Sequence, residues 1–280
     1  MALEPNSVQR DRMLSHGKTR LTLVQFLVGK VPSRIPEYLS QTQQIVTGEK
    51  GKREHQLKID QILTGGQHPY QYLIVDSFPS SQALLLAHEI SREIRQAALQ
   101  EIYGIYLKPN STINKAVKAA GRLAPTLARW LNTLEAKHFP RESDELDPET
   151  DPALGAIREF SARDRDQPFY MMNLNQFAPQ EDRRYLAGKA AYKRYSLWIT
   201  PYLISVGGYP VVFDKPLGTY IGDQQSSLLN NWSEFGLVYY PSRTSFLRLM
   251  TNAPRRAAAF RRAGLQKAIL MPCVNNSNQI

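Results

Sequence analysis

One sequence pattern occurs twice in the chain, and this repeat restricts the possible folds more than any other feature. Phe78-Pro79-Ser80 and Tyr240-Pro241-Ser242 both read aromatic-Pro-Ser, and both follow an apolar run. Each leads into an amphipathic segment and then into a short apolar segment that ends in proline. Pro79 precedes Pro109 by 30 positions, and Pro241 precedes Pro272 by 31. The matched spacing predicts two copies of one structural unit.

Each copy is predicted to fold as strand, helix, strand, strand, helix, strand. Runs of β-forming residues between turn residues indicate the strands, and apolar residues at helical spacing indicate the helices. In the first copy we expect strands at 21–28, 57–63, 70–78 and 102–107, and helices at 36–47 and 81–98. In the second we expect strands at 169–174, 232–240 and 268–271, an interrupted strand or hairpin at 202–213, and helices at 180–198 and 246–257. The predicted class is α+β, with two ferredoxin-like βαββαβ units in tandem.

A chain of 280 residues suits about two domains of ordinary size. We expect a flexible N-terminal arm at 1–19, a diverged first unit at 20–109, a helical and acidic linker at 110–152, a second unit at 153–273 and a tail at 274–280. The linker is predicted to begin with a helix at 112–138, which Pro125 kinks. A short helix at 153–162 then leads into the second unit.

The composition excludes several classes of protein. No run of about 18 apolar residues occurs, so no transmembrane helix is expected. The N-terminus is polar and lacks the apolar region of a secretory signal. Cys273 is the single cysteine, which excludes an internal disulfide and a Cys-rich metal site. A cytoplasmic protein is the simplest expectation.

The formal net charge of +10 raises the question of anionic partners. The densest basic segment is 255–267, which holds four arginines and one lysine and no acid, whereas 141–166 is acidic in places. The two segments could face each other in the fold, or the basic one could bind an anionic partner. Nucleic acid is unlikely as that partner, because neither 70–78 nor 232–240 shows the basic-Gly-aromatic pattern of RNA-recognition motifs.

The second copy also carries a specific set of residues. It opens with PFYMMNLN at 168–175, has Tyr192 and Tyr195 on its first predicted helix, and continues through Gly207-Gly208. Trp232-Ser233-Glu234 then leads through LVYYPSR to Phe246, and RAGL at 262–265 precedes the last strand. In these residues, over about 153–273, the chain resembles the DUF1330-like proteins of the dimeric α/β-barrel superfamily. The first copy keeps the layout but few of the specific residues.

The resemblance implies a fold and a range of activities. Members of the superfamily pair two ferredoxin-like units face to face, so that two four-stranded sheets enclose a barrel. One sheet face of each unit is covered by its own helices and the other needs a partner, so we expect this chain to form the pair within one molecule, as a monomer or a weak homodimer. Members include cofactor-independent monooxygenases, lactone isomerases and haem proteins. For the DUF1330-like proteins the resemblance implies no settled reaction.

The candidate site lies in the second copy, between sheet and helices or inside the barrel. The predicted catalytic residues are Glu234, Tyr202 and Arg262, and the predicted ligand-binding residues are Asn173, Tyr192, Tyr195, Trp232 and Arg243. Trp232, Glu234, Val238 and Tyr240 are expected to share one strand face. A carboxylate beside aromatic rings suits a general base with a raised pKa. The alternative is that Glu234 is solvated near a strand end or paired with an arginine, and that the tyrosines pack in the core.

Histidine is informative by its distribution. All five histidines precede the second copy, and Phe260-Arg261 occupies the place before RAGL where related proteins often carry histidine. This excludes histidine acid/base chemistry and haem ligation by the second copy. No two histidines show metal-ligand spacing, so we expect neither a metal nor a cofactor.

Two functions therefore stand as hypotheses. The first is a cofactor-independent monooxygenase or isomerase that acts on a small apolar or aromatic molecule. The second is a non-catalytic module that binds a small ligand or another protein. An open site beside Glu234 favours the first hypothesis, and a site filled by the protein's own side chains favours the second.

Overall fold

The computed structural model describes residues 3–109, 147–179, 187–222, 226–229 and 231–275. The described helices of the first half are α1 (Ser7–Leu14), the short 3-10 helix η1 (Pro32–Arg34), α2 (Ile35–Gly48), α3 (Ser81–Ile90) and α4 (Arg92–Ala98). Those of the second half are α6 (Leu154–Ala162), α7 (Gly188–Ser205), α8 (Arg243–Asn252) and α9 (Arg255–Gly264). The strands are β1 (Leu21–Gly29), β2 (Lys52–Ile59), β3 (Tyr72–Phe78), β4 (Leu99–Leu107), β5 (Phe169–Phe177), β6 (Tyr209–Asp214), β7 (Pro216–Ile221), β8 (Glu234–Tyr240) and β9 (Leu265–Asn275).

The two halves of the chain arrange their strands in the same order. The nine-stranded sheet runs β6-β8-β5-β9-β2-β3-β1-β4-β7. The first half contributes β2-β3-β1-β4, and the second half contributes β6-β8-β5-β9 together with β7 at the other end of the sheet. When β7 is left aside, each half places its first strand between its third and its fourth. All of these pairs are antiparallel. This is the strand order of a ferredoxin-like unit, and it confirms the α+β class.

The sheet closes on itself through β6 and β7. These strands stand at opposite ends of the strand order, yet only Lys215 separates them in the chain. β6 pairs with β8 of its own half, whereas β7 pairs with β4 of the other half. A second seam joins the halves where β2 pairs with β9. The two halves therefore enclose one interior between their sheets.

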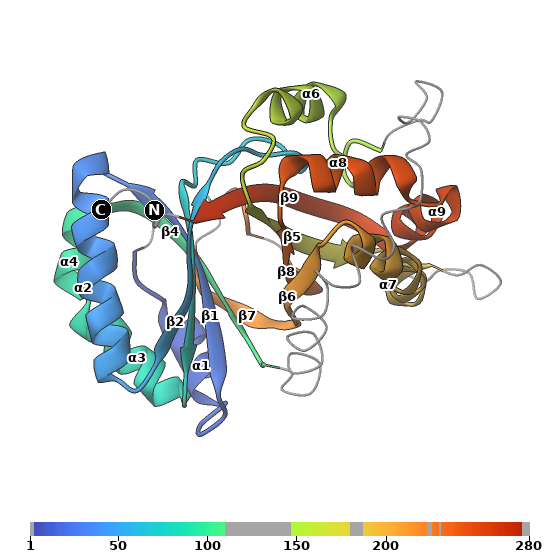
Figure 1. Ribbon diagram of the computed structural model, residues 1–280. Coiled ribbons are helices and arrows are strands. Elements are labelled where there is room, and N and C mark those ends of the chain that lie inside the picture. The colour runs from blue at the N-terminus through green and yellow to red at the C-terminus, as the bar shows by residue number, and fades with distance from the viewer. Residues whose placement is uncertain (1–2, 110–146, 180–186, 223–225, 230, 276–280) are drawn as a thin grey trace.

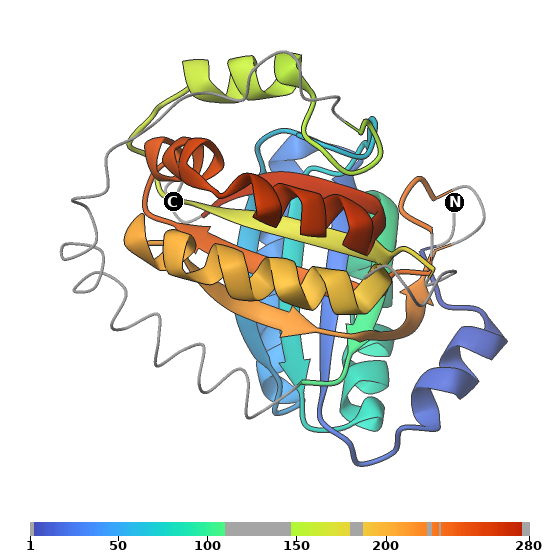
Figure 2. The ribbon, with the colours of Figure 1, turned by 90° about the vertical axis from the view of Figure 1, so that its right-hand side faces the viewer.

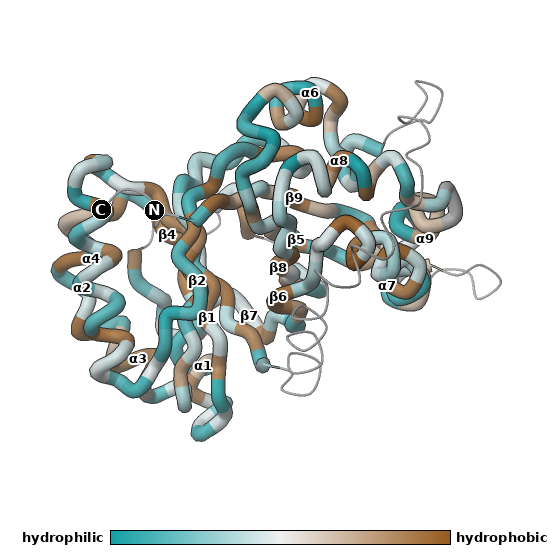
Figure 3. Tube along the Cα trace, viewed as in Figure 1, coloured by the Kyte–Doolittle hydropathy of each residue, from teal (hydrophilic) through white to brown (hydrophobic). Residues whose placement is uncertain are grey.

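Three apolar layers follow from this arrangement. The central layer lies inside the barrel and combines residues of both halves, such as Val24 and Phe26 with Met172 and Leu237. The outer layers lie under α2, α3 and α4 on one side and under α7 and α8 on the other. Figure 1 shows these two groups of helices on opposite outer sides of the strands, and Figure 2 shows α7 and α8 crossing the sheet of the second half. In Figure 3 many residues along the strands between the two helical groups are coloured as hydrophobic.

Both serines of the repeated aromatic-Pro-Ser pattern cap helices. The Ser80 side chain accepts a hydrogen bond from the amide of Ala83 at the start of α3, and the Ser242 side chain accepts one from the amide of Ser245 at the start of α8. Serine is favoured at this position because its hydroxyl satisfies an amide that the helix leaves free.

A buried ionic cluster ties the halves together outside the barrel. Asp60, which follows β2, forms ion pairs with Arg163 at 2.6 Å and with Arg243 at 2.8 Å. The Arg243 guanidinium also lies 4.6 Å from the ring centre of Phe160 on α6. Arg243 is 1% exposed, so its charge is compensated by Asp60 rather than by water.

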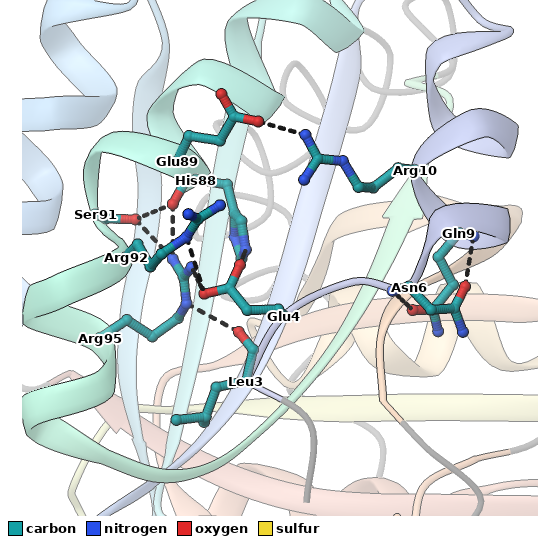
Figure 4. Close-up of polar contacts among 10 residues, drawn as sticks. All are labelled: Leu3, Glu4, Asn6, Gln9, Arg10, His88, Glu89, Ser91, Arg92 and Arg95. Atoms are coloured by element: carbon teal, nitrogen blue, oxygen red, sulfur yellow. Dashed lines mark hydrogen bonds and ion pairs between the residues drawn. The ribbon is translucent and has the colours of Figure 1, made fainter.

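The N-terminal segment is also held by charges. The Glu4 carboxylate accepts hydrogen bonds from His88 of α3 at 3.0 Å and from Arg95 of α4 at 2.5 Å, as Figure 4 shows. Arg10 of α1 forms a further ion pair with Glu89. The segment that we expected to be an arm at 1–19 thus contains a helix that packs on β7 and α3.

Most predicted elements are confirmed, with several differences. The helices predicted at 81–98 and 246–257 are each divided in two, the first into α3 and α4 and the second into α8 and α9. Tyr202 to Ser205 form the last turn of α7 rather than a strand, because the helix continues past Pro201 and ends where Gly207 adopts a φ of +79°. The predicted strand at 57–63 begins earlier, since β2 spans Lys52–Ile59. β7 was not predicted. The helix predicted at 112–138 lies outside the described residues.

Candidate active site

The candidate site is built where β5, β8 and α7 meet. The register of the sheet places Asn175 of β5 directly opposite Glu234 of β8. On the helix side of this pair, α7 brings Tyr192 over the sheet. α7 packs closely against α9 because α9 carries Gly264 at their contact. A Cβ atom at position 264 would lie 2.7 Å from the backbone nitrogen of Tyr192. The site therefore requires glycine at position 264.

Asn175 connects the polar groups of the site. Its side-chain amide donates a hydrogen bond to the hydroxyl oxygen of Tyr192 at 2.8 Å and another to Oε1 of Glu234 at 3.2 Å. Asn175 is 1% exposed, so both bonds form away from water. Ser233 fixes the chain beside this group, because its amide donates to the Asn175 carbonyl and its hydroxyl accepts from the Phe177 amide. The three side chains of Asn175, Tyr192 and Glu234 form one network, here called the Glu234 network.

The charge state of Glu234 is unusual for a carboxylic acid. Burial raises the pKa of Glu234 from its ordinary value of 4.5 to about 7. The hydrogen bond from Asn175 and the positive charge of Lys189 on α7 act in the opposite direction but are weaker. At neutral pH the carboxyl group is therefore poised between its protonated and ionised forms. This is the property that a general acid or base needs at pH 7.

Aromatic rings surround the network on its helix side. The ring centre of Tyr192 lies 5.3 Å from those of Phe177 and Tyr195. Burial, and then the nearby negative charge of Glu234, raise the pKa of Tyr192 well above its ordinary value. Tyr192 is therefore a neutral hydroxyl that can donate a hydrogen bond. The setting combines one titratable carboxyl, one amide and an aromatic wall, which suits proton transfer to or from a small apolar molecule.

The structure separates Trp232 from Glu234. Trp232 precedes β8 and packs inside the barrel, where its indole nitrogen donates to the Leu228 carbonyl at 2.8 Å. Glu234 instead lies on the helix face of the sheet, the face that Val238 and Tyr240 also occupy. The expectation that all four share one face is therefore wrong for Trp232. The period of two holds only within the strand, and Trp232 lies before its first residue.

The two predicted arginines have other partners. Arg262 of α9 forms an ion pair with Asp151 at 2.9 Å, and its neighbour Arg261 pairs with the same carboxylate at 2.9 Å. The basic and acidic segments thus face each other at Asp151. Arg243 belongs to the ionic cluster around Asp60, described above. Among the described contacts, neither Arg243 nor Arg262 bonds to the Glu234 network.

The remaining predicted residues lie near the network to different degrees. Tyr195 packs beside Tyr192 on α7, whereas Tyr202 lies farther along the helix and packs against the apolar layer under α8. Asn173 is on β5, and its side-chain amide donates to the Met171 carbonyl at 2.9 Å. The structure therefore brings Glu234, Tyr192 and Tyr195 together.

Sequence reasoning missed Asn175 and Lys189. Asn175 stands in the same opening-strand motif as Asn173, two residues farther on and hence on the same face of the strand. The signal that separates them is the strand register, which places Asn175 rather than Asn173 opposite Glu234. Lys189 lies at the start of α7, and its effect on Glu234 depends on the packing of that helix.

The described residues offer neither a metal site nor a membrane span. No group of three or more His, Cys, Asp or Glu side chains there could hold a metal ion. No helix in that part of the chain is long and apolar enough to cross a membrane.

Comparison with known proteins gives a limited result. No family model matches the sequence, and no curated protein matches it. Among solved structures, a protein of unknown function from Rhodopseudomonas palustris is 25% identical, with a TM-score of 0.40, over 44% of this chain and 94% of its own. A mutant chlorite dismutase from Candidatus Nitrospira defluvii is 8% identical over 94% of both chains, with a TM-score of 0.45. A candidate monooxygenase from Lactobacillus acidophilus NCFM is 8% identical over 92% of this chain and 95% of its own, with a TM-score of 0.42.

These likenesses are too low to carry an argument about activity. The function is therefore argued from the geometry and chemistry of the Glu234 network alone.

Proposed function

We propose that this protein is a cofactor-independent enzyme of the isomerase or monooxygenase kind, acting on a small apolar or aromatic molecule at the Glu234 network. The observation that carries the proposal is the buried Glu234 carboxyl, whose pKa of about 7 suits a general base in neutral solution. Asn175 holds this carboxyl in place, and aromatic side chains surround it. A purely structural carboxylate at this position would gain more from an arginine partner than from one neutral amide.

The two kinds of reaction share their first step. The ionised Glu234 carboxylate takes a proton from an acidic C–H or phenolic O–H group of the substrate, and the electron pair of that bond stays on the substrate. In an isomerisation the protonated Glu234 returns the proton to another atom. In a monooxygenation dioxygen would be the second substrate and the oxidant: the carbanion bonds to one oxygen atom to form a hydroperoxide, which loses water to leave a C=O group, so that a CH2 group and O2 become C=O and H2O. Tyr192 is a neutral donor that can hydrogen-bond to the negative charge that develops.

Hydrogen exchange tests the shared step without knowledge of the product. Small compounds with acidic C–H groups, such as lactones, are incubated with the protein in heavy water, and deuterium uptake at carbon is followed by proton NMR, because O–H protons exchange without a catalyst. We expect uptake by at least one compound class, with a rate that rises through about pH 7. Glu234→Gln should lower the rate by about 100-fold or more, since general-base catalysis contributes factors of that size.

Glu149→Gln is the matched control, because it removes one carboxylate from an exposed position. It should leave the exchange rate unchanged. Equal rates in the wild type and in Glu234→Gln would refute the role of Glu234. Binding without exchange in both proteins would favour the alternative function, a non-catalytic ligand-binding or interaction module.

We also propose that the two halves are diverged copies of one ferredoxin-like unit, paired within the chain as a dimeric α/β-barrel. The matching strand orders and the matching serine caps support this proposal. The boundaries at 20–109 and 153–273 and the likeness of the second unit to DUF1330-like proteins remain part of the same proposal. A chain that carries both units needs no second molecule to complete the barrel, so sedimentation should detect a monomer or a weak homodimer.

A further inference from the structure

The barrel interior contains a polar group that the Glu234 network does not use. Glu101 of β4 lies inside the barrel and is 5% exposed. Its Oε1 accepts a hydrogen bond from the Tyr70 hydroxyl at 2.6 Å, and the Tyr70 oxygen lies 2.8 Å from the Ser226 hydroxyl. Tyr70 precedes β3 and Ser226 follows β7, so three separate segments meet at this carboxylate. They meet at one end of the barrel, since Glu101 pairs with Val28 near the end of β1.

Glu101 is a buried carboxylate that has no counter-charge within the described part of the chain. No lysine, arginine or histidine of the described residues forms an ion pair with it. The buried carboxylate of Asp76 differs in this respect, because it forms an ion pair with Arg53 at 2.9 Å. A buried ionised carboxylate is costly unless a positive charge compensates it. The neutral Tyr70 hydroxyl supplies one hydrogen bond but no charge.

Tyr103 adds a second buried polar group to the same interior. It lies two residues after Glu101 on β4, on the same face of the strand, and its ring is fully buried in the barrel. Among the described residues its hydroxyl has no partner at normal hydrogen-bond geometry, although the Thr219 and Trp232 side chains lie near enough to act on it. The Trp232 indole nitrogen already donates to the Leu228 carbonyl. Leaving a buried hydroxyl unpaired costs free energy, so a ligand that pairs with it gains affinity.

Aromatic rings line the interior around Glu101 and Tyr103. The ring centre of Phe26 lies 5.9 Å from that of Tyr70 and 6.1 Å from that of Tyr103, and Trp232 belongs to the same apolar layer. The faces of aromatic rings attract cations, most strongly where water is excluded. A carboxylate among aromatic rings is the chemistry that recognises organic ammonium ions.

We propose that this end of the barrel is a second binding site, which takes a small organic amine with its ammonium group on Glu101 and its apolar part against Phe26 and Trp232. The Tyr103 hydroxyl accepts one further hydrogen bond from the ammonium group. This site and the Glu234 network lie on opposite faces of the second-half sheet, since Trp232 faces the interior and Glu234 faces α7. The proposal therefore does not depend on the activity proposed for Glu234.

Isothermal titration with a matched pair of probes tests the site. Benzylamine is cationic at pH 7.5, and benzyl alcohol has nearly the same size without the charge. We expect the wild type to bind benzylamine at least tenfold more tightly than benzyl alcohol. Glu101→Gln keeps an acceptor for Tyr70 but removes the charge, and it should abolish the preference. Glu37→Gln, an exposed carboxylate on α2, is the control and should retain it.

Tyr103→Phe provides an independent arm that does not depend on how Glu101→Gln folds. It removes only a hydroxyl that has no partner, so the variant should fold as well as the wild type. Its affinity for benzylamine should fall by about two- to tenfold, the usual effect of one hydrogen bond. Three results would overturn the proposal. They are no benzylamine binding by the wild type, undiminished binding by Glu101→Gln, and binding that Glu234→Gln abolishes while Glu101→Gln retains it.

Discussion

The raised pKa of Glu234 predicts how the stability of the protein changes with pH. Replacing Glu234 by glutamine keeps an oxygen that can accept the Asn175 hydrogen bond but removes the ionisable group. We expect Glu234→Gln to be more stable than the wild type at alkaline pH and equally stable at acid pH. The reason is that the wild type must bury a negative charge only when Glu234 is ionised.

The sign and size follow from linkage between protonation and folding. The folded-state pKa is about 7 and the ordinary value is 4.5, so the folded protein binds the proton more tightly than the unfolded chain. Below pH 4.5 both states carry the proton and the charge costs nothing. Stability is then lost as the pH rises from 4.5 through 7. At 1.36 kcal/mol for each pKa unit, the loss at pH 8 is at most about 3 kcal/mol.

Urea unfolding followed by far-UV circular dichroism measures this difference. Wild type and Glu234→Gln are unfolded at half-unit steps from pH 4 to 8.5, and the difference in the free energy of unfolding is plotted against pH. We expect a curve near zero at pH 4 that climbs toward about 3 kcal/mol in favour of Glu234→Gln at pH 8. Glu149→Gln, the exposed control, should give a much flatter curve.

Two outcomes would refute the reasoning. A difference that does not change with pH would mean that burial does not raise the pKa of Glu234. A wild type that gains stability over the variant as the pH rises would mean that a positive charge, such as that of Lys189, outweighs the burial.

Three further predictions concern the network and the ionic clusters. Asn175→Ala removes the amide that donates to both Tyr192 and Glu234, so it should lower the free energy of unfolding by about 2 kcal/mol. It should also raise the pKa of Glu234 further, which carbon NMR titration measures. An unchanged titration of Glu234 would contradict the hydrogen bond from Asn175. Arg243→Met removes one ion-pair partner of Asp60 and should lower the free energy of unfolding in urea by about 3 kcal/mol. An unchanged midpoint of the urea transition would show that the ion pair is dispensable. Burial acts to raise the pKa of Glu4, but hydrogen bonds from His88 and Arg95 outweigh it and hold the pKa at about 2. Glu4→Gln should therefore be less stable than the wild type above pH 4.5, and the difference should vanish as the pH falls toward 2. A difference in thermal unfolding that does not change with pH would argue against these hydrogen bonds.

Local signals made much of the fold predictable. The β-forming run at 21–28 became β1, the proline at position 36 stands in the first turn of α2, and Ser80 caps α3 as expected. Each of these signals acts through a residue's own conformational preference or through neighbours a few positions away. The apolar stretch after Pro201 misled the prediction for the same reason, because its β-branched residues favour a strand whereas the helix continues to Ser205.

Distant contacts could not be predicted in this way. β7 forms because it pairs with the edge strand β4, which lies more than 100 positions earlier in the chain. The residues of β7 themselves do not indicate this pairing. The candidate site shows the same division. The sequence identified Glu234, Tyr192 and Tyr195 as candidates. The strand register placed Asn175 opposite Glu234, and the packing of the segment before β8 placed Trp232 inside the barrel.

The sequence by itself thus determined which segments become strands and helices and which residues could carry chemistry. The tertiary structure decided what surrounds each of them. Burial raises the pKa of Glu234, and none of the described residues brings a positive charge to Glu101, which lies among the apolar side chains of the barrel interior. Both properties depend on the removal of water from a charged group, and only the packing of distant segments achieves that removal.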